Sequence, residues 1–295
     1  MILVTGASGF IGSAIVPELL SQGYSVRALC RSADAAKSLP KKADASIGDV
    51  TIPETLGSAL HGVDTVIHLA GMVSYSKPRE ELFRVNAIGT RNLLDQCGDV
   101  KKFVLSSSVS VYGQVRGEAD ESYPVLPGTP YGESKAAAER FVSASGIRSV
   151  VLRIAPIYGK GSEAWVKNLE LLDRGFPIPS TRNLTHVVHV TDAVQAIVKS
   201  VEKGEGTYNI ASEKPVPFVE FAEAIVRMLG KKPRRLPSFM VCAMASAAGM
   251  KRYMDVLTMN RNYSIRKARE ELGYAPKADF ESKAREMVEW YRGLS

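Results

Sequence analysis

The chain has 295 residues, enough for one large domain or for a domain with a smaller lobe. Hydrophobic residues make up 45% and charged residues 23%, which is typical of a soluble globular protein. A net charge of +7 favours anionic ligands or serves solubility. The densest basic run, 231–235, is interrupted by proline and has no interleaved aromatic residues, so it indicates a solvated loop and not a nucleic-acid site.

Cysteine and histidine spacing argues against disulfides and metals. The three cysteines are widely separated, and the four histidines show no zinc-ligand spacing, so we expect no metal and a reducing cytoplasm.

No basic segment precedes the first apolar run, so no signal peptide is expected. The longest apolar run, 239–250, is shorter than the ~20 residues that cross a bilayer, so no membrane span is expected. It predicts a buried helix or the lining of an apolar pocket.

Through the first half of the chain, short β-branched runs alternate with longer amphipathic stretches. The short runs are almost continuously apolar, as in strands covered on both faces. They predict strands at 2–5, 25–30, 45–49, 65–70, 102–107 and 149–154. The amphipathic stretches predict helices at 10–22, 53–60, 79–97 and 131–145. This alternation favours an α/β fold with a doubly wound parallel sheet, the Rossmann fold.

A glycine-rich turn joins the first predicted strand to the first predicted helix. Gly6, Gly9 and Gly12 lie three residues apart in the segment TGASGFIG. Glycines at such positions permit a tight turn, the approach of a pyrophosphate, and close packing of helix on strand. The helix N-terminus then offers free N–H groups to the phosphates. Glycines alone are a weak signal, but with a strand before them and a helix after them they predict a dinucleotide site.

The end of the second predicted strand bears on the choice of cofactor. Cys30 stands where an acid would bind the ribose of NAD, and Arg31 follows it. A guanidinium binds a phosphate bidentately, and Arg27 adds a second cation, so NADP is favoured and NAD stays possible. The alternative is that both arginines are merely solvated at a strand edge. Asp49, after the third strand, is placed to accept the adenine amino group.

The second half of the chain has a more broken pattern. It predicts a helix at 161–175, an extended segment at 186–190, a helix from Thr191 and a strand at 207–211. Beyond Pro215 the pattern is mostly helical. We expect an interleaved arrangement of a dinucleotide-binding domain and a smaller, mostly helical C-terminal substrate lobe. The domain is expected to comprise 1–157 and 185–212, and the lobe 158–184 and 213–295.

Several motifs together carry a family resemblance. Besides the glycine turn they are GDV (48–50), HLAG (68–71), VNAIGTRNLL (85–94), SSSVSVYG (106–113), YGESK (131–135), VVHVTDAVQA (187–196), TYNIAS (207–212) and KAREELGYAPK (267–277). With them the chain resembles the extended short-chain dehydrogenase/reductase superfamily, whose members include NAD(P)-dependent epimerases and dehydratases. The resemblance covers nearly the whole chain.

The resemblance implies a Ser-Tyr-Lys catalytic site made of Ser108, Tyr131 and Lys135. A free phenol has a pKa near ~10, too high for acid–base work at neutral pH. The Lys135 ammonium and an oxidised nicotinamide are both expected to lower the pKa of Tyr131. Tyr131 would then exchange a proton with a substrate oxygen that Ser108 hydrogen-bonds, while Lys135 holds the nicotinamide ribose. By itself a tyrosine four residues before a lysine is more often an ordinary helix-surface pair.

Further residues are expected to contact the cofactor. Asn86 matches the asparagine of the family's N-x-x-G-T stretch, with a more structural role. The full set of expected cofactor-binding residues is Gly6, Ser8, Gly9, Phe10, Ile11, Gly12, Arg27, Arg31, Asp49, Val50, Leu69, Ala70, Gly71, Asn86, Tyr131, Lys135 and Pro156. The resemblance also implies a homodimer formed through helices 79–97 and 131–145.

Two departures from the sugar-nucleotide pattern bear on the substrate. Pro156 stands where such enzymes commonly carry asparagine, and Thr185 stands where they commonly carry a pyrophosphate-binding arginine, with Arg182 near enough to substitute. Segments 26–32 and 262–277 resemble the dihydroflavonol-reductase and 3β-hydroxysteroid-dehydrogenase-like branch. We therefore favour an oxidoreductase of a ketone or secondary alcohol. The alternatives are a nucleotide-sugar epimerase or dehydratase, and a non-catalytic dinucleotide-binding scaffold, which would not need the Ser-Tyr-Lys set.

Overall fold

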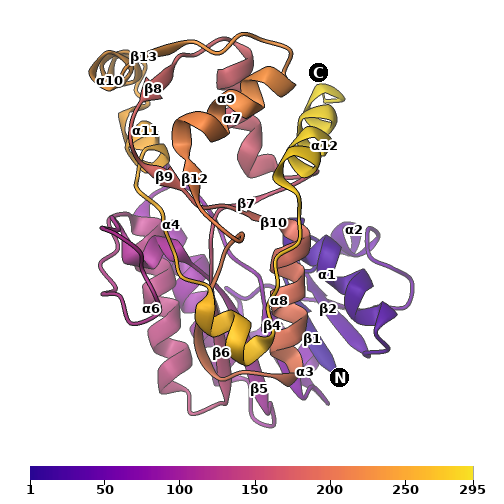
Figure 1. The fold of residues 1–295 in the computed structure, drawn as a ribbon. Coiled ribbons are helices and arrows are strands. Elements are labelled where there is room, and N and C mark those ends of the chain that lie inside the picture. Colours follow the sequence, from indigo (N-terminus) through magenta and orange to yellow (C-terminus); the bar gives the residue numbers. More distant parts are fainter. Residues whose placement is uncertain (295) are drawn as a thin grey trace.

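A seven-stranded, entirely parallel sheet forms the larger half of the molecule (Figure 1). The structure, a computed structural model, describes residues 1–294. The strands lie in the order β11-β6-β5-β4-β1-β2-β3. They are β1 (Ile2–Thr5), β2 (Val26–Cys30), β3 (Asp44–Ile47), β4 (Thr65–His68), β5 (Lys102–Ser108), β6 (Ser149–Ile154) and β11 (Gly206–Ile210). This order confirms the predicted doubly wound fold. From β1 the chain adds β2 and β3 on one side, and from β4 it adds β5, β6 and β11 on the other side. Folds of this kind bind ligands at the carboxyl ends of the two strands between which the order switches, in this case β1 and β4.

Helices cover both faces of the sheet because successive strand residues point to opposite sides. Ile2 and Val4 of β1 pack with α1 (Phe10–Ser21) and α8 (Val190–Glu202). Leu3 faces the other side, where it packs with α5 (Gly89–Asp95) and α6 (Pro130–Ala144). Short helices α2 (Ala33–Ala36) and α3 (Gly57–Leu60) complete the outer sheet edge.

The predicted helix over 79–97 is one continuous but irregular rod. It consists of α4 (Arg79–Phe83), a π-helical turn at Arg84–Ile88 and then α5. A π turn adds a residue to the helical turn and changes which side chains face the sheet. In this case the turn contains Asn86, one of the expected site residues.

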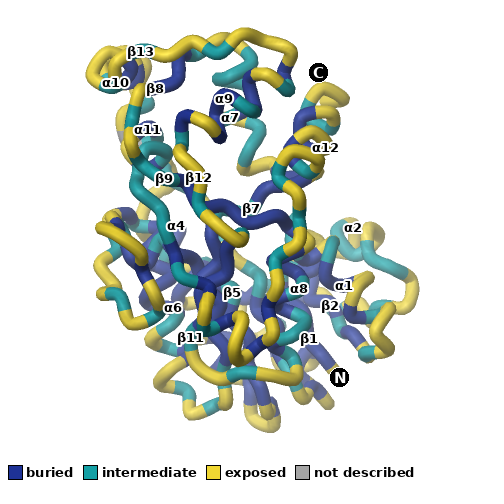
Figure 2. The backbone as a smooth tube through the Cα atoms, viewed as in Figure 1, coloured by how far each residue is buried: buried dark blue, intermediate teal, exposed yellow. Residues whose placement is uncertain are grey.

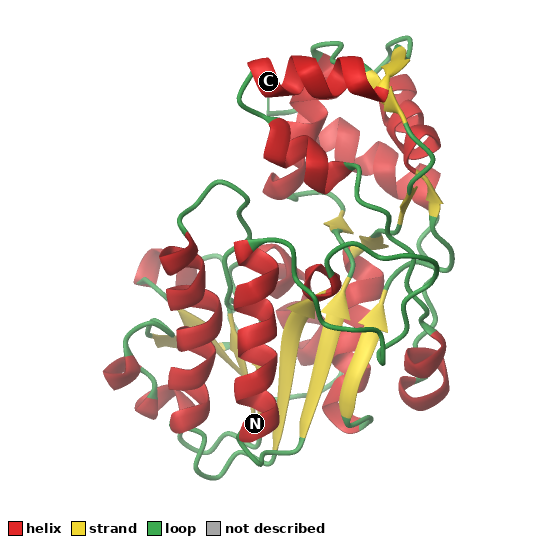
Figure 3. Cartoon of the chain, turned by 90° about the vertical axis from the view of Figure 1, so that its left-hand side faces the viewer, coloured by secondary structure: helices red, strands yellow, loops and turns green. Residues whose placement is uncertain are grey.

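A smaller lobe lies over the carboxyl ends of the strands, as Figures 1 and 3 show. Its core joins Leu169, Phe221, Ile225, Met287 and Val288. These residues come from the three helices α7 (Glu163–Asp173), α9 (Phe218–Met228) and α12 (Phe280–Arg292). Two further helices, α10 (Ser238–Ala247) and α11 (Lys251–Leu257), pack on each other at one end of the lobe.

Short strand pairs lie between the two halves and within the lobe. They are β7 (Ile157–Tyr158) with β10 (Val188–His189), β9 (Leu184–Thr185) with β12 (Val216–Pro217), and β8 (Ile178–Ser180) with β13 (Arg235–Pro237). Of these strands the sequence pattern predicted only β10, inside the extended segment 186–190. Two- and three-residue strands are too short to carry an alternating hydrophobic pattern, which explains why the others were missed.

Two expectations about the C-terminal part are wrong. Residues 265–274, assigned to the lobe from sequence, pack under the sheet with α8, because Ile265, Ala268 and Leu272 are buried in its core. The apolar run 239–250 is largely helical as predicted, yet its exposed side chains include Phe239 at 75%. It is neither a buried helix nor part of the cleft lining described below. No helix in residues 1–294 is both long and apolar enough to cross a membrane.

Candidate active site

A cleft of about 1260 Å³ lies between the carboxyl edge of the sheet and the lobe. Its sheet side is lined by the glycine turn, the ends of β2 and β4, and the Ser108, Tyr131 and Lys135 side chains. Its lobe side is lined mainly by apolar residues of α7, α9 and α11. The structure thus brings together the three residues expected to be catalytic and every expected cofactor-binding residue except Arg27.

The glycine turn leaves no room for side chains. Gly6 has a φ of +67°, and a Cβ there would lie 2.8 Å from the backbone nitrogen of Ala70. A Cβ on Gly12 would lie 2.1 Å from the carbonyl oxygen of Gly6. The turn leads directly into α1, whose first N–H groups have no partner within the helix. These features fit a dinucleotide pyrophosphate, as in the general pattern for such turns.

The two arginines of the β2 region have different surroundings. The Arg27 guanidinium donates to the Asp44 carboxylate at 2.7 Å and to the His61 carbonyl at 2.7 Å. These contacts hold the Arg27 side chain outside the cleft. Arg27 was expected to contact the cofactor, and the structure does not place it where it could do so. Arg31 lines the cleft, is exposed, and pairs with no acid within residues 1–294.

Asp49 lies in the cleft wall but its carboxylate is already partly engaged. One oxygen accepts hydrogen bonds from the backbone N–H and the hydroxyl of Thr51, both at 2.8 Å. The contacts fix the loop after β3, and Val50 beside it packs against Gly89. The expected role of Asp49 toward adenine stays a prediction.

Tyr131 and Lys135 lie one turn apart on α6, and both are buried. The helix begins at Pro130 because the Thr129 hydroxyl accepts a hydrogen bond from the Gly132 N–H at 3.1 Å. The Ser108 hydroxyl accepts a hydrogen bond from the Ser110 N–H and donates one to the Ser110 hydroxyl, both at 3.1 Å, and it lies near enough to the Tyr131 phenol to act on its pKa. The Lys135 ammonium donates to the carbonyl oxygen of Ser106 at 2.5 Å. The phenol, the serine hydroxyl and the ammonium therefore converge at the end of β5.

Burial decides the protonation of both groups. It raises the pKa of the Tyr131 phenol well above its usual value, against the lowering effect of the Ser108 hydroxyl. This direction is opposite to the one expected from sequence, because removal from water outweighs the favourable contacts. Burial also lowers the pKa of Lys135 to about 8, against the opposing charge of Glu139. The protein alone therefore holds a neutral phenol beside an ammonium that is readily deprotonated.

Asn86 braces the site from the π-helical turn. Its side-chain oxygen accepts from the Met72 N–H at 2.7 Å, and its nitrogen donates to the Met72 carbonyl and the Ser134 hydroxyl, each at 2.9 Å. Asn86 thus ties the loop after β4 to the helix that carries Tyr131. This agrees with the structural role expected from sequence.

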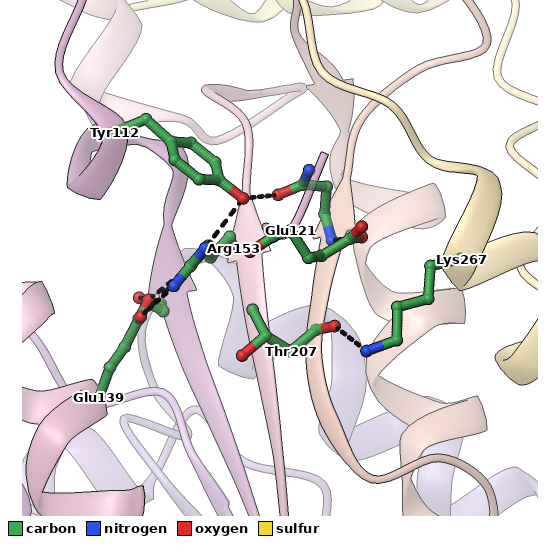
Figure 4. A network of polar contacts seen from close by, with 8 residues as sticks. Tyr112, Glu121, Glu139, Arg153, Thr207 and Lys267 are labelled. Atoms are coloured by element: carbon green, nitrogen blue, oxygen red, sulfur yellow. Dashed lines mark hydrogen bonds and ion pairs between the residues drawn. The ribbon is translucent and has the colours of Figure 1, made fainter. Parts of the chain in front are cut away.

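A buried ion pair behind the site was missed by sequence reasoning (Figure 4). Glu139, one turn after Lys135 on α6, pairs with Arg153 of β6 at 2.8 Å. It also accepts a 2.5 Å hydrogen bond from Ser107, the neighbour of Ser108. Arg153 donates in turn to the hydroxyl of Tyr112 at 3.0 Å. The available signal was the four-residue spacing from Lys135 to Glu139 on a helix already assigned to the site.

The lobe wall of the cleft is mostly apolar. Its apolar members include Trp165, Leu171, Leu172, Phe176, Ile178, Phe218, Phe221, Tyr253, Met254, Val256 and Leu257. Its arginine, Arg261, donates to the carbonyl oxygens of Val256 at 2.5 Å and Leu257 at 3.3 Å. Arg182 does not line the cleft, and Pro156 and Thr185 do. The lobe therefore presents mainly apolar surface toward the hydroxyl groups of the site.

Comparisons with known proteins agree with this geometry. Residues 2–211 match the NAD dependent epimerase/dehydratase family, which confirms the resemblance inferred from the motifs. A 3-beta-hydroxysteroid dehydrogenase of Mycolicibacterium neoaurum is 27% identical, covering 99% of this chain and 92% of that protein. A 4-hydroxy-2-methyl-3-oxo-4-farnesyl-3,4-dihydroquinoline-1-oxide ketoreductase of Stigmatella aurantiaca is 29% identical, covering 92% and 91%.

The similarity extends to solved structures. The UDP-glucose 4-epimerase of Thermus thermophilus, in complex with NAD, superposes with a TM-score of 0.81 at 28% identity, covering 100% of this chain and 99% of that one. Both dehydrogenases and epimerases are thus similar to this chain over nearly its full length.

Proposed function

Because the chain belongs to the NAD dependent epimerase/dehydratase family, we propose that it is an NADP-dependent oxidoreductase of apolar ketones or secondary alcohols. Membership in this family, within the extended short-chain dehydrogenase/reductase superfamily, makes it a nicotinamide-dependent enzyme. The observation that carries the finer proposal is the placement of Ser108 and Tyr131 in one cleft, opposite an apolar lobe wall.

The chain's own residues supply binding, orientation and proton transfer. The nicotinamide, when bound, supplies the site that gives or takes a hydride. Ser108 donates a hydrogen bond to the substrate oxygen, and Tyr131 transfers a proton to or from the same oxygen. Lys135 places a positive charge beside the phenol and so favours the phenolate during the reaction. Its contact with the Ser106 carbonyl fixes the ammonium, and Asn86 holds the neighbouring loop.

The proposed preference for NADP rests on Arg31. It is a cation at the end of β2 with no acid partner within residues 1–294, and it lines the cleft. No carboxylate follows β2 at the position of Cys30 or Arg31 to repel a 2′-phosphate. A free guanidinium in that position suits bidentate binding of phosphate. The solved relative described above holds NAD, so a direct comparison of the two cofactors is needed.

An apolar substrate is supported by the lobe wall. The rings of Trp165, Phe218, Phe221 and Tyr253 lie on the side opposite Ser108 and Tyr131. Pockets of this kind bind apolar ligands and orient them through few polar groups. The two curated relatives described above are named for a steroid and a farnesylated quinoline oxide.

A nucleotide-sugar epimerase is the second candidate, because Arg261 lines the cleft and a solved relative is a UDP-glucose 4-epimerase. The guanidinium of Arg261 is, however, hydrogen-bonded to carbonyl oxygens at the end of α11. These bonds would have to break before it could bind a pyrophosphate.

A thermal-shift screen separates the two candidates. With NADP present, steroid and prenylated ketones are expected to raise the melting temperature, and UDP-glucose to leave it unchanged. The ketones that stabilise the protein are then assayed with NADPH by the loss of absorbance of the reduced nicotinamide. Protection by UDP-glucose alone, with a cofactor that co-purifies and resists exchange, would favour the epimerase instead.

A further inference from the structure

Helix α10 presents an apolar face that nothing in residues 1–294 covers. Its sequence, SFMVCAMASA, contains no charged side chain. Val241 and Ala245 are fully buried against α11. On the other side Phe239 is 75% exposed, Met240 42% and Met244 44%. A helix on the surface of a globular protein normally places polar residues there. Figure 2 shows α10 at the tip of the lobe, largely exposed.

A basic segment precedes α10 along the chain. The segment 231–235 leads through β13 into α10, and all four of its basic residues are exposed. Lys231 pairs with Asp173, and Arg235 pairs with Glu223. Lys232 and Arg234 have no acidic partner among the residues that the structure describes. Asp173 and Glu223 are thus already engaged, and Glu220 also acts on Arg235, which leaves Lys232 and Arg234 as the cations of the segment without an ion pair in the part of the chain that the structure describes.

We propose that α10 and the segment 231–235 together bind an anionic membrane surface. Phe239, Met240 and Met244 would enter the boundary between headgroups and acyl chains, and Lys232 and Arg234 would contact the phosphates of anionic lipids. An uncharged apolar helix face flanked by lysine and arginine is what an interfacial helix needs. The ten residues of α10 fit a helix that lies on the surface and does not cross it.

Charge favours a bilayer over a second copy of the chain. A symmetric contact between two copies through α10 would bring the same basic segment from each copy to one interface. That interface would then carry the positive charges of both segments and no added anions, which costs energy. An anionic bilayer satisfies both the apolar face and the cations at once.

The buried side of α10 is connected to the cleft through α11. Met254 of α11 packs with Val241 and Ala245 of α10 and also lines the cleft. Tyr253 and Leu257 of α11 connect the two regions in the same way. The proposed surface nevertheless lies outside the Ser108–Tyr131 site, so its test does not depend on turnover.

Vesicle flotation of the whole protein tests the proposal. The protein is expected to float with vesicles of equal parts phosphatidylglycerol and phosphatidylcholine, and to stay behind with phosphatidylcholine alone. Phe239→Ser/Met244→Ser and Lys232→Glu/Arg234→Glu are each expected to lower the partition coefficient at least about tenfold. Added salt is expected to weaken binding, because the attraction to the headgroups is screened.

Matched variants on another surface control for charge and hydrophobicity. Lys41→Glu/Lys42→Glu makes the same charge change at two exposed lysines, and Val125→Ser/Leu126→Ser removes two exposed apolar side chains. Both are expected to float like the unchanged protein. Melting curves check that each variant is folded, and the loop variant Lys232→Glu/Arg234→Glu removes no buried contact.

Three results would overturn the proposal. The first is failure of the unchanged protein to float with anionic vesicles. The second is flotation that is reduced neither by Phe239→Ser/Met244→Ser nor by Lys232→Glu/Arg234→Glu. The third is a dimer, detected by sedimentation, that Phe239→Ser/Met244→Ser dissociates, together with no binding of the protein to vesicles. A second copy of the chain would then be the occupant of this face.

Discussion

The two walls of the cleft differ in how their side chains are held. On the sheet side Lys135 and Asn86 are buried and fixed by hydrogen bonds to β5 and to the loop after β4, and Tyr131 is buried beside them. On the lobe side most lining groups, such as Phe221 and Leu257, make only apolar contacts, although Trp165 and Tyr253 each donate one hydrogen bond. Directional bonds define one geometry, whereas apolar contacts tolerate changes of shape. The reacting groups are therefore fixed, while the wall that contacts the rest of the substrate can vary.

The largest effect is expected from removing one hydroxyl on the sheet side. Tyr131→Phe should lower turnover by about a thousandfold, because the proton donor is lost while the ring stays in place. NADPH binding should be unchanged. Steady-state kinetics with the best ketone from the thermal-shift screen, and a fluorescence titration of NADPH, measure the two quantities.

Tyr75→Phe is the matched control, since Tyr75 lines the same cleft and lies edge-on against Tyr131 at 6.2 Å between ring centroids. It should retain most of the turnover. Substantial activity in Tyr131→Phe would contradict the proposed proton transfer.

Breaking the Glu139–Arg153 pair tests how much this ion pair contributes to the stability of the sheet side. Glu139→Gln leaves the Arg153 charge buried without a counter-charge, so we expect a loss of about 3 kcal/mol in the free energy of unfolding. Urea denaturation at neutral pH measures it.

Glu133→Gln on the same helix breaks an exposed pair with Arg79 and should cost less than about 1 kcal/mol. Equal losses in the two variants would mean that the buried pair gives no special support to the site.

The pKa of Lys135 predicts a pH dependence of stability. The folded protein releases this proton at about pH 8, whereas the unfolded chain keeps it up to about pH 10.5. Between these values the unfolded state binds more protons, so the free energy of unfolding should rise with pH. Relative to Lys135→Met, the rise should be on the order of 2 kcal/mol.

Denaturation curves between pH 7 and pH 10.5 measure this difference. Lys101→Met, at a lysine that is 78% exposed, provides the control and should leave the pH dependence unchanged. A pH-independent difference between the protein and Lys135→Met would show that the lysine is not desolvated.

The smallest expected effect concerns the cofactor. Arg31→Ala should weaken NADPH binding about tenfold and leave NADH binding nearly unchanged, because only NADPH carries the 2′-phosphate. Arg27→Ala should lower the melting temperature through the lost Asp44 and His61 contacts, with the NADPH-to-NADH ratio unaltered. Equal affinities of the unchanged protein for both cofactors would refute the preference for NADP.

Sequence patterns were sufficient for the sheet and for the residues that meet at its edge. Continuous apolar runs marked the strands from β1 to β6, and the spacing of Gly6, Gly9 and Gly12 marked the turn after β1. Both signals depend on the local chain alone. The assignment of Tyr131 and Lys135 to a site with Ser108 needed the family resemblance as well, since the spacing of one helical turn is by itself common on helix surfaces.

Features that depend on contacts between distant segments could not be predicted. Arg27 and Arg31 are alike in sequence, and only the fold brings Asp44 and His61 to the first of them. The run 239–250 is apolar enough for a core, but hydrophobicity does not tell whether another element covers it. The pKa of Tyr131 rises because several elements enclose it together.

The placement of 265–274 has a consequence for how the protein is made. Ile265 and Leu272 complete the layer under the sheet, and Lys267 donates to the Thr207 carbonyl of β11 at 3.0 Å (Figure 4). The lobe core, in turn, needs Met287 from α12. During synthesis neither half can close around its apolar core until these late segments have left the ribosome. Ending the chain before Ile265 is therefore expected to leave both cores incomplete, so that the shortened chain aggregates under conditions in which the full chain folds.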